Sequence, residues 1–506
     1  MNKKINSALI SVFNKDGLET IIELLHKHNV KIISTGGTAE FIRKLKVPVT
    51  EVESITNYPA LFGGRVKTLQ PQIFGGILNR RDNKEDQKEK TQHKIADIDL
   101  VIVDLYPFEE TLASGGSAEE IIEKIDIGGI SLIRAAAKNF NDVVVIPSKH
   151  QYAELASILE KNNETTLEER KKFAGEGFEV TSTYDSAIRG YFQGKPLRYG
   201  ENPHQKAEFV GDLGESFTQL HGKELSYNNL IDTEAAIMTV SDFTNPAFAI
   251  IKHMNACGLA ERGATSAQGS GEPKEGSLFE AYKAAYNADP LSAFGGILAA
   301  NRIIEKDIAA LIKEQKLFIE VIIAPDFSKD ALAILMEKKD CRILRWKSPS
   351  LPTKQMRTCF TGILSQDRDI HVESEKDLKI VTKREPTEKE KGDLLMASIA
   401  TKHLKSNSVA LVKDGTLLAM GCGQTSRIDA LKQAIDKAGK FGFSLEGAVL
   451  SSEAFFPFPD CVELAAQVGV SAVIHPGGSK NDQASIDMAD KYNVAMVTTG
   501  FRHFKH

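Results

Sequence analysis

Short runs of β-branched and aliphatic residues alternate with segments of helical periodicity along the first 150 residues, and this alternation limits the fold more than any other feature. In chain order the runs predict strand Ala8–Val12, helix Gly17–His28, strand Lys31–Ser34, helix Thr38–Leu45, strand Leu100–Leu105, helix Ile130–Lys138 and strand Asp142–Ile146. Strands that alternate with helices across short connections favour a parallel sheet covered by helices. The sequence therefore predicts an α/β fold.

The rest of the chain continues the same pattern. Apolar runs predict buried strands at Phe248–Ile251, Val409–Val412, Gly447–Leu450, Ala472–Ile474 and Val494–Val497. A polar run at Lys161–Lys172 precedes a helical segment that ends at Gly194, and Lys195-Pro196 follows it. We therefore expect one domain over 1–195 and a second region over 196–506, which the charged segment Lys383–Lys391 divides near 383–392. The polar stretches Arg80–Lys94 and Arg262–Gly276 are predicted to be surface loops.

Composition excludes several classes of protein. The 506 residues carry 63 basic and 68 acidic side chains, a balance that disfavours a protein bound to nucleic-acid backbones. No apolar run reaches the roughly 18 residues of a membrane span, and the amino terminus lacks the pattern of a signal peptide. The five cysteines are scattered without a CxxC pair, which argues against a disulfide framework or a thiolate metal site. These features predict a soluble cytoplasmic protein.

Two glycine pairs suggest a phosphate pocket in the first domain. The segment Ser34-Thr35-Gly36-Gly37-Thr38 lies between a predicted strand and a predicted helix, where backbone N–H groups can meet an anion. The segment Gly64-Arg65-Val66-Lys67-Thr68 places two cations and a hydroxyl after a second glycine pair. Any one glycine pair is more often a plain turn, but together the segments indicate a sugar-phosphate site.

The second region holds a candidate catalytic pair and two weaker signals. Lys252 and His253 end an apolar strand, which is where α/β folds place reactive side chains, although a structural pair is nearly as common. The segment Gly421–Ser426 begins like a dinucleotide-binding loop but has serine at the third glycine position. His371-Val372-Glu373 resembles half of a zinc-deaminase signature, yet no PCxxC follows it. The basic segment Arg502–His506 either frays in solvent or closes an anion site.

Taken in order, the motifs resemble one family along nearly the whole chain, from Ser11 to His506. They are Ser-Thr-Gly-Gly-Thr at 34–38, Gly-Gly-Arg-Val-Lys-Thr-Leu at 63–69, Leu-Tyr-Pro-Phe at 105–108, Ile-Asp-Ile-Gly-Gly at 125–129, Arg-Ala-Ala-Ala-Lys-Asn at 134–139, Leu-Arg-Tyr-Gly-Glu-Asn-Pro-His-Gln at 197–205, Lys-His at 252–253, Ser-Asn-Ser at 406–408, Ser-Arg at 426–427, Phe-Phe-Pro-Phe at 455–458 and the final Arg-His-Phe-Lys-His. This series resembles the bifunctional purine-biosynthesis enzymes that fuse aminoimidazole carboxamide ribonucleotide (AICAR) transformylase to inosine monophosphate (IMP) cyclohydrolase.

The resemblance implies that the second region transfers a formyl group from 10-formyltetrahydrofolate, a co-substrate, to the 5-amino group of AICAR. By motif, His253 would accept the proton of the amine, Lys252 would stabilise developing charge or protonate the folate nitrogen, and Asn407 would orient the reacting groups. Residues expected around the nucleotide are Arg198, Tyr199, His204, Ser292, Phe294, Gly295, Arg427, Arg502 and Phe504. Residues expected around the folate are Glu320, Phe456, Pro457 and Asp460. Pro459 and Cys461 depart from the usual pattern at that position.

The resemblance also implies that the first domain closes the ring of the formylated nucleotide, with loss of water, to give IMP. The catalytic positions matched are Lys67, Tyr106, Asp126 and Lys138. The positions matched for the ribose phosphate and substrate are Ser11, Lys15, Thr35, Gly37, Thr38, Arg65, Thr68, Gly128 and Gly129. Phe13 stands where a serine is usual and Asp104 where an asparagine is usual, so both alter the surroundings of this site.

At the level of the fold, the resemblance implies a methylglyoxal-synthase-like parallel-sheet domain followed by two cytidine-deaminase-like α/β units. It further implies a homodimer with shared transformylase sites, no redox cofactor, no catalytic metal, no nucleic-acid partner and no membrane partner. Two other functions remain open at this stage. A nicotinamide-dependent oxidoreductase would use Gly421–Ser426, and a nucleotide sensor would keep the fold but have lost catalysis.

Overall fold

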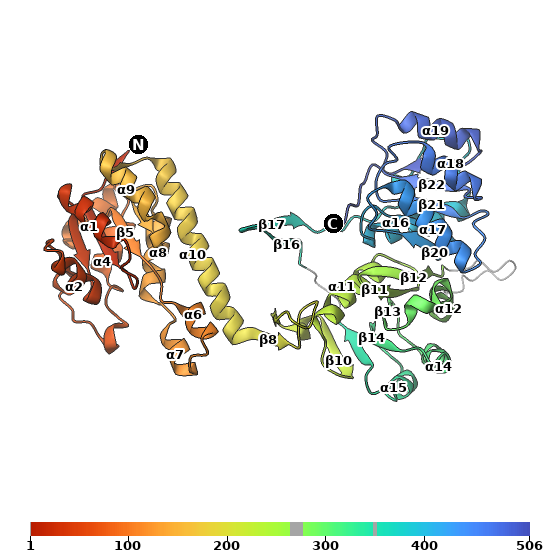
Figure 1. Ribbon diagram of the computed structural model, residues 1–506, viewed down its shortest axis with the longest axis horizontal. Coiled ribbons are helices and arrows are strands. Elements are labelled where there is room, and N and C mark those ends of the chain that lie inside the picture. The colour runs from red at the N-terminus through yellow and green to blue at the C-terminus, as the bar shows by residue number, and fades with distance from the viewer. Residues whose placement is uncertain (1, 264–276, 348–351) are drawn as a thin grey trace. The chain divides into compact units, whose positions relative to one another are not determined.

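The computed structural model describes residues 2–263, 277–347 and 352–506, and the chain divides into two compact units, Met1–Gly194 and Lys195–His506 (Figure 1). The predicted surface loop Arg262–Gly276 lies, from residue 264 onward, outside the described residues. Among the helices of the described part, none combines the length and the apolar character needed to cross a bilayer.

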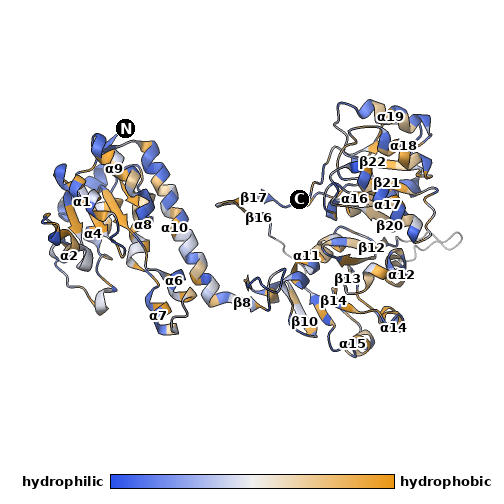
Figure 2. Ribbon diagram, viewed as in Figure 1, coloured by the Kyte–Doolittle hydropathy of each residue, from blue (hydrophilic) through white to orange (hydrophobic). Residues whose placement is uncertain are grey.

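The first unit is a parallel sheet with helices on both faces, as predicted. Its five strands lie in the order β4-β3-β2-β5-β6. They are β2 (Ser7–Ser11), β3 (Lys31–Ser34), β4 (Thr50–Glu51), β5 (Leu100–Val103) and β6 (Val144–Ile146). The central strands are apolar at nearly every position because helices bury them from both sides, and Figure 2 colours them orange.

The helices of the first unit agree with the predicted periodicity at most positions. They are α1 (Leu18–Lys27), α2 (Gly36–Lys44), α3 (Val52–Thr56), α4 (Pro71–Leu78), α5 (Lys84–Gln92), α6 (Phe108–Ala113), α7 (Ala118–Glu123), α8 (Gly128–Lys138), α9 (Tyr152–Lys161) and α10 (Leu167–Gln193). Helix α10 begins inside the polar run at 161–172, because Thr166 and Glu169 form a reciprocal capping box there.

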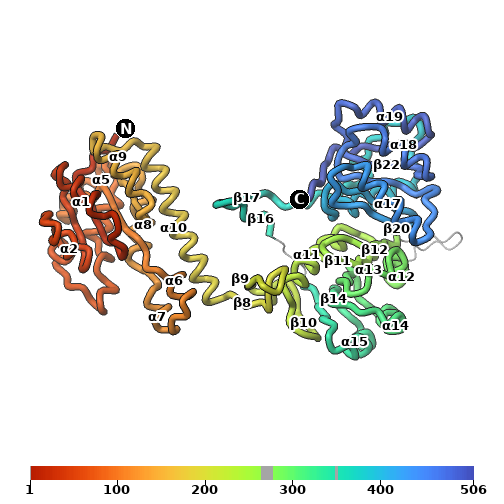
Figure 3. The backbone as a smooth tube through the Cα atoms, viewed as in Figure 1, coloured from red at the N-terminus to blue at the C-terminus, as the bar shows by residue number. Residues whose placement is uncertain are grey.

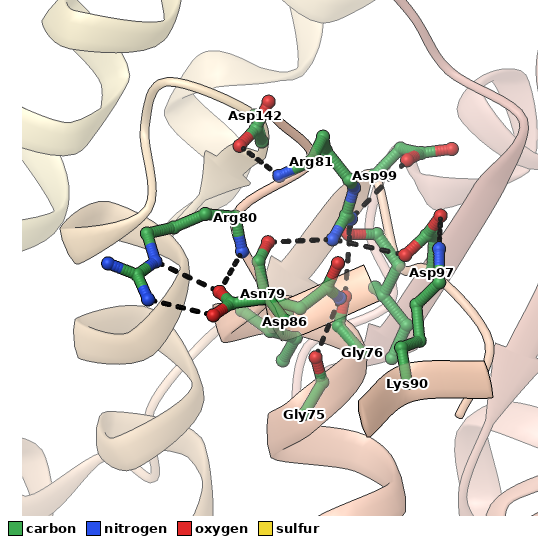
Figure 4. A network of polar contacts seen from close by, with 12 residues as sticks. Gly75, Gly76, Asn79, Arg80, Arg81, Asp86, Lys90, Asp97, Asp99 and Asp142 are labelled. Atoms are coloured by element: carbon green, nitrogen blue, oxygen red, sulfur yellow. Dashed lines mark hydrogen bonds and ion pairs between the residues drawn. The ribbon is translucent and has the colours of Figure 1, made fainter. Parts of the chain in front are cut away.

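The prediction of a loop at Arg80–Lys94 is wrong, because helix α5 occupies most of it. Asn83 caps the helix by accepting hydrogen bonds from the backbone N–H groups of Glu85 and Asp86. Figure 4 shows the polar network that holds the segment without any buried side chain on the helix. Arg80 pairs with Asp86 at 2.7 Å and lowers the pKa of that carboxyl to about 2, while Arg81 reaches the carbonyl oxygens of residues 76 and 79. In the sequence, Asn83 followed three residues later by Asp86 is a signal for the start of a helix and could have predicted α5.

The second unit is built on one mixed sheet of twelve strands with a repeated pattern. The order is β10-β15-β14-β13-β11-β12-β20-β19-β21-β22-β23-β18, so the halves meet where β12 and β20 pair antiparallel. In the first half, β11 and β12 form an antiparallel hairpin, and β13, β14 and β15 run parallel to one another. In the second half, β19 and β20 form the hairpin, and β21, β22 and β23 are the parallel strands. The two halves separate by colour in Figure 3, green to cyan for the first and blue for the second. The two expected α/β units are therefore confirmed.

Each half follows the same order of elements along the chain. The first half comprises α11 (Tyr227–Ser241), β11 (Ala247–Lys252), β12 (Asn255–Glu261), α12 (Leu278–Ala288), β13 (Gly296–Ala300), α14 (Lys306–Glu314), β14 (Ile319–Ala324), α15 (Lys329–Leu335) and β15 (Arg342–Trp346). The second comprises α16 (Glu388–His403), β19 (Val409–Lys413), β20 (Thr416–Gly421), α17 (Arg427–Lys440), β21 (Val449–Ser452), α18 (Asp460–Gln467), β22 (Ala472–His475), α19 (Asp482–Lys491) and β23 (Ala495–Thr498). The repeat is structural, since the sequence shows no matching segments of useful length.

Smaller elements complete the second unit. Strands β8 (Gly194–Leu197) and β9 (Ala207–Val210) form a two-stranded ribbon, while β10 (Phe217–His221) and β18 (Lys379–Ile380) add to the two edges of the large sheet. Strands β16 (Lys354–Cys359) and β17 (Gly362–Asp367) form a separate antiparallel hairpin. All of their residues are exposed except Cys359, which is half-buried.

Candidate active sites

A cavity of about 720 Å³ opens in the first unit at the carboxyl ends of its parallel strands. Open α/β sheets bind their ligands at this edge. The cavity wall contains every residue predicted for this unit except Lys138: Ser11, Lys15, Thr35, Gly37, Thr38, Arg65, Lys67, Thr68, Tyr106, Asp126, Gly128 and Gly129. The structure thus brings together segments that are widely separated in the sequence.

Both glycine pairs lie against Lys67. A Cβ atom on Gly36 would come within 3.3 Å of the Lys67 ammonium, and one on Gly64 would come within 2.3 Å of the Lys67 Cε. Gly64 also has a positive φ of 94°, which other residues adopt only with strain. The absence of side chains at these positions therefore leaves room for Lys67 beside the amino end of α2.

Several predicted phosphate ligands have partners within the protein. The Lys15 ammonium donates to the carbonyl oxygens of Val12 and Phe13, and the Thr38 hydroxyl donates to Val12 at 3.0 Å. Arg65 pairs with the carboxylate of Glu123. Among the residues that the structure describes, no side chain caps the amino end of α2. Its free N–H groups and the Lys67 ammonium are therefore the groups best placed to receive an anion.

Tyr106 faces two carboxyl groups in the same cavity. Burial raises its pKa, and the negative charges of Asp126 and Asp104 raise it further, so the phenol stays protonated and can donate a hydrogen bond. Burial also raises the pKa of Asp126, against hydrogen bonds from the N–H groups of Ile130 and Gly129. The N–H group of Gly129 donates to Asp126 at 2.6 Å, so it is occupied by the protein itself.

The two departures from the family pattern, Phe13 and Asp104, lie together. Asp104 accepts hydrogen bonds from the N–H groups of Phe13 and Asn14, and these bonds hold the loop that follows β2. Burial raises the pKa of Asp104 despite those bonds. The Phe13 ring lies edge-on to Tyr106, with centroids 5.8 Å apart, and Lys124 lies over both rings. Phe13 and Lys124 line the cavity, and of these two only Phe13 was expected near the site.

Lys138 is the one predicted residue of the first unit that the cavity does not include. It is the last residue of α8, whereas the cavity lies at the first turn of that helix, and its side chain is exposed. An eleven-residue helix separates its ends by about 15 Å, at 1.5 Å per residue. Lys138 therefore lies outside the cavity lining, and its catalytic role stays a prediction.

The second unit contains a cavity of about 1390 Å³. Among the predicted residues, Arg198, Tyr199, His253, Gly295 and Glu320 line it. Its basic side chains also include Lys195, Lys223, Arg342 and Lys347, which suits an anionic ligand. Arg198 donates to the Tyr199 hydroxyl at 2.9 Å and lies over the Tyr199 ring.

The predicted catalytic pair lies at the end of β11, as expected. Lys252 donates to the carbonyl oxygen of Phe294 at 2.8 Å, and His253 begins a tight turn with a positive φ of 52° and an exposed side chain. Asp232, which was not predicted, accepts a hydrogen bond from the N–H of Met254. Burial raises the pKa of Asp232, against hydrogen bonds from that turn.

Of the other residues predicted around the nucleotide, Ser292 lies in α13 (Pro290–Ala293), and Phe294 lies beside Gly295 in the turn between α13 and β13. His204 lies in the exposed connection between β8 and β9. Asn407, Arg427, Arg502 and Phe504 do not line the cavity. Arg502 and Phe504 are exposed in the carboxyl-terminal segment, with the Arg502 guanidinium 4.4 Å from the Phe504 ring centroid.

Arg427 is a buried structural cation in this chain. It pairs with the buried Glu453 at 2.6 Å and donates to the side-chain oxygen of Asn407 at 2.9 Å. Its guanidinium holds Asn407 and is buried, and the expected place of Arg427 around the nucleotide stays a prediction.

The residues predicted around the folate differ in how far their side chains are exposed. The Phe456 side chain is completely buried in the core of the second half, with its ring 5.0 Å from that of His475. Its neighbours Phe455 and Phe458 are the exposed aromatic residues of this motif, while Pro457 is half-buried and Asp460 exposed. Glu320 pairs with Arg342 at 2.8 Å. Cys461 belongs to the same core, where burial raises the pKa of its thiol to about 12.

The dinucleotide-like segment has a packing role. A Cβ on Gly421 would lie 1.8 Å from the carbonyl oxygen of Ala430, so this glycine lets β20 pack against α17. The His371-Val372-Glu373 segment likewise has protein partners, with His371 stacked on Phe501 and Glu373 paired with His503. Neither segment supports the oxidoreductase or zinc readings.

Comparisons with known proteins cover the chain from end to end. The model of the MGS-like domain matches residues 17–131, and the model of the AICARFT/IMPCHase bienzyme matches residues 136–437. A protein of Bacteroides thetaiotaomicron named bifunctional purine biosynthesis protein PurH is 51% identical over 100% of this chain and 99% of its own. The protein of that name from Rhodospirillum rubrum is 45% identical, over 99% of each chain.

Among solved structures, a dCMP deaminase from the cyanophage S-TIM5 is similar over 22% of this chain and 97% of its own, at 22% identity and a TM-score of 0.18. The relatives match over their full length, and the bienzyme model covers more than half of the 506 residues. The chain therefore belongs to the AICARFT/IMPCHase bienzyme family, whose two activities are AICAR formyl transfer and IMP ring closure.

Proposed function

We propose that the two cavities divide the family's consecutive reactions between them. The second unit, residues 196–506, would transfer the formyl group from 10-formyltetrahydrofolate to AICAR, and the first unit, residues 1–195, would close the ring to IMP. The observation that carries the assignment is that different reactive side chains line the two cavities. The cavity of the second unit has an exposed imidazole, that of His253, as a base. The cavity of the first unit instead combines Lys67 with a protonated phenol.

Formyl transfer needs a base and a donor of positive charge. The amine of AICAR is a weak nucleophile, because its lone pair is shared with the imidazole ring. His253 takes the proton from this amine as its nitrogen attacks the formyl carbon, and Asp232 steadies the turn that presents His253. Lys252 stabilises the oxyanion or protonates the departing folate nitrogen. Asn407, whose side-chain oxygen accepts a hydrogen bond from Arg427, orients the reacting groups. Arg198 and Tyr199 bind the nucleotide.

Ring closure needs the formyl carbonyl to be polarised and a water molecule to leave. The carboxamide nitrogen attacks the formyl carbon while Lys67 and the Tyr106 hydroxyl donate to the carbonyl oxygen. Asp126 takes a proton from that nitrogen and returns it to the resulting hydroxyl group, which leaves as water. The amino end of α2 receives the ribose phosphate. Phe13 and Tyr106 supply an aromatic wall for the base.

The direct test is incubation of the purified chain with AICAR and 10-formyltetrahydrofolate, with IMP and tetrahydrofolate followed separately. We expect both products in equal amounts. Release of tetrahydrofolate without IMP would contradict the assignment of the first unit, and absence of both would contradict the whole proposal.

We also propose that the chain is a homodimer that works in the cytoplasm. A two-stranded hairpin is marginally stable alone in water, yet the β16–β17 hairpin exposes Met356, Phe360, Ile363 and Leu364 by 61% or more. In a symmetric oligomer, a second copy of the chain packs against the hairpin and covers these apolar side chains.

Replacing Ile363 with aspartate should weaken the dimer at least about 100-fold, because burial of an isoleucine is worth roughly 1.5–3 kcal/mol and a buried unpaired charge adds a further cost. Sedimentation or light scattering over a dilution series measures the change. The matched control is Ile303→Asp, since Ile303 is an exposed isoleucine outside the hairpin. A variant that dimerises as tightly as the control would show that the hairpin lies outside the interface.

A further inference from the structure

The carboxyl-terminal segment Arg502–His506 presents alternate side chains in opposite directions. His503 is buried, with 4% of its surface exposed, whereas its neighbours Arg502 and Phe504 are exposed. Lys505 is half-buried, and His506 is exposed again. An extended chain places successive side chains on opposite sides. One set of side chains therefore faces the protein while the other, which holds both predicted nucleotide ligands, faces outward.

The inward set ties the segment to two other parts of the second unit. His503 places Nδ1 2.6 Å from the carboxylate of Asp369 and Nε2 3.0 Å from that of Glu373. Ser406 and Lys505 exchange two hydrogen bonds, of 2.9 and 3.0 Å, directly beside Asn407. The position of Arg502 and Phe504 relative to Asn407 is therefore set by these anchors.

Both ring nitrogens of His503 face carboxylates, so the ring makes both hydrogen bonds only as an imidazolium. Burial alone would lower its pKa, but the hydrogen bonds to Asp369 and Glu373 outweigh burial and raise the pKa to about 9. Three other ionisable residues lie near His503 and its two carboxylates. The His371 ring centroid is 6.5 Å from that of His503, and the positive charge of Lys402 lowers the pKa of Asp369. The backbone carbonyl of Glu453 accepts a hydrogen bond from the N–H group of His503. The Glu453 carboxylate is itself paired with Arg427.

We propose that His503 is a positioning residue for formyl transfer, whose paired imidazolium holds the carboxyl-terminal segment so that Arg502 and Phe504 face the nucleotide beside Asn407. The inference rests on the proposed function, which assigns Arg502 and Phe504 to the nucleotide. A neutral imidazole has one N–H, so it would leave one carboxylate against a lone pair. The Glu373 side chain is only 2% exposed, and water cannot replace the lost partner there.

The direction of the pH dependence follows from the raised pKa. The contribution of the imidazolium to holding the segment is complete below about pH 6.5, the ordinary value, and is lost as the pH rises through about 9. Since the outward side chains bind substrate, loosening the segment raises the KM for AICAR more than it lowers kcat.

The test is Asp369→Asn, because the Asp369 side chain is 48% exposed and its removal spares the buried Glu373. We expect the pH at which the KM for AICAR rises to move down by at least about one unit, which is at least about a threefold higher KM near pH 8.5. Ring closure of the formylated nucleotide, measured in the same preparation, keeps its wild-type pH profile. The matched control is Asp330→Asn, which removes an exposed carboxylate paired with Lys306 in the same unit.

Equal alkaline midpoints in the wild type and Asp369→Asn would overturn the proposal. Arg502→Ala separates this failure from failure of the proposed function. If that variant keeps a normal KM, the assignment of Arg502 to the nucleotide is wrong. If it raises the KM while Asp369→Asn behaves as the wild type, only the role of His503 is wrong.

Discussion

Removal of the His253 imidazole should slow formyl transfer about a thousandfold and leave ring closure unchanged. A positioned base contributes about 10²–10⁴ to rate, and the amine of AICAR depends on one because its lone pair is delocalised. His253 is the exposed imidazole of the cavity wall in the second unit, and Lys252 beside it is held by the carbonyl of Phe294. Both His253 and Lys252 belong to the second unit, so neither supports the fold of the first unit, where ring closure is proposed to occur.

The substitution should be made as both His253→Ala and His253→Asn. His253 has a φ of 52°, and asparagine tolerates this left-handed conformation better than alanine, so His253→Asn keeps the turn while removing the base. Release of tetrahydrofolate measures the first reaction, and IMP formed from added formylated nucleotide measures the second. Near-normal transfer in His253→Asn would assign the base elsewhere. Slow transfer in His253→Ala alone would mean that the turn, and not the imidazole, is needed.

A matched control is available in the same turn. Met254 also has a positive φ, of 64°, and a partly exposed side chain, and Asp232 holds its N–H group. Met254→Asn therefore makes a comparable change to the backbone preference without touching the imidazole. We expect it to transfer formyl groups within about threefold of the wild type. A large loss in this control would show that the shape of the turn dominates the effect of His253→Asn.

The central strands of both units could be predicted from sequence because their residues are apolar on both faces. The run Ala247–Lys252 is buried at all positions except the last, which is the pattern expected of a strand covered on both sides. Helix α5 shows the opposite case. It buries no side chain and is held by ion pairs such as Arg80–Asp86, so hydrophobic periodicity carries no information about it. The two like units of the second region were implied by the family resemblance and not by internal sequence similarity, because the repeat is one of topology.

The predicted site residues differ in whether they line the cavities, and the sequence could not show this difference. A motif identifies residues that belong near a site but does not say which of them face the ligand. Phe456 and Arg427 lie in the expected motifs, yet one packs in the core and the other pairs with Glu453. Lys138 ends a helix whose opposite end borders the cavity.

The contacts that Phe13 and Asp232 make at the candidate sites were not predicted. Phe13 and Asp232 act through an exposed ring and a hydrogen bond to a turn, and neither contact has a signature in the sequence. Phe13 differs from the usual family residue, so the resemblance itself directed attention to its lost hydroxyl and away from the aromatic ring it adds.

Removal of the Lys67 ammonium should slow ring closure about 10²–10³-fold while formyl transfer continues, so that formylated nucleotide accumulates. Loss of one preorganised donor to a developing oxyanion typically has an effect of this size. Lys67→Met is the preferred variant, because it keeps most of the apolar stem that lies against Gly64. The accumulating intermediate is measured by chromatography during incubation with both substrates.

Gly64→Ala tests the same residue from the other side. The added Cβ would lie 2.3 Å from the Lys67 Cε and 2.8 Å from its ammonium nitrogen, so it displaces the side chain without removing the charge. We expect a smaller loss of ring closure, of about tenfold, with formyl transfer unchanged. A matched control is Gly115→Ala, which has a similar positive φ of 77° and open space around it in the same unit. If the control loses as much ring closure as Gly64→Ala, backbone strain explains the effect. If only Gly64→Ala and Lys67→Met lose it, the position of the ammonium group decides the rate.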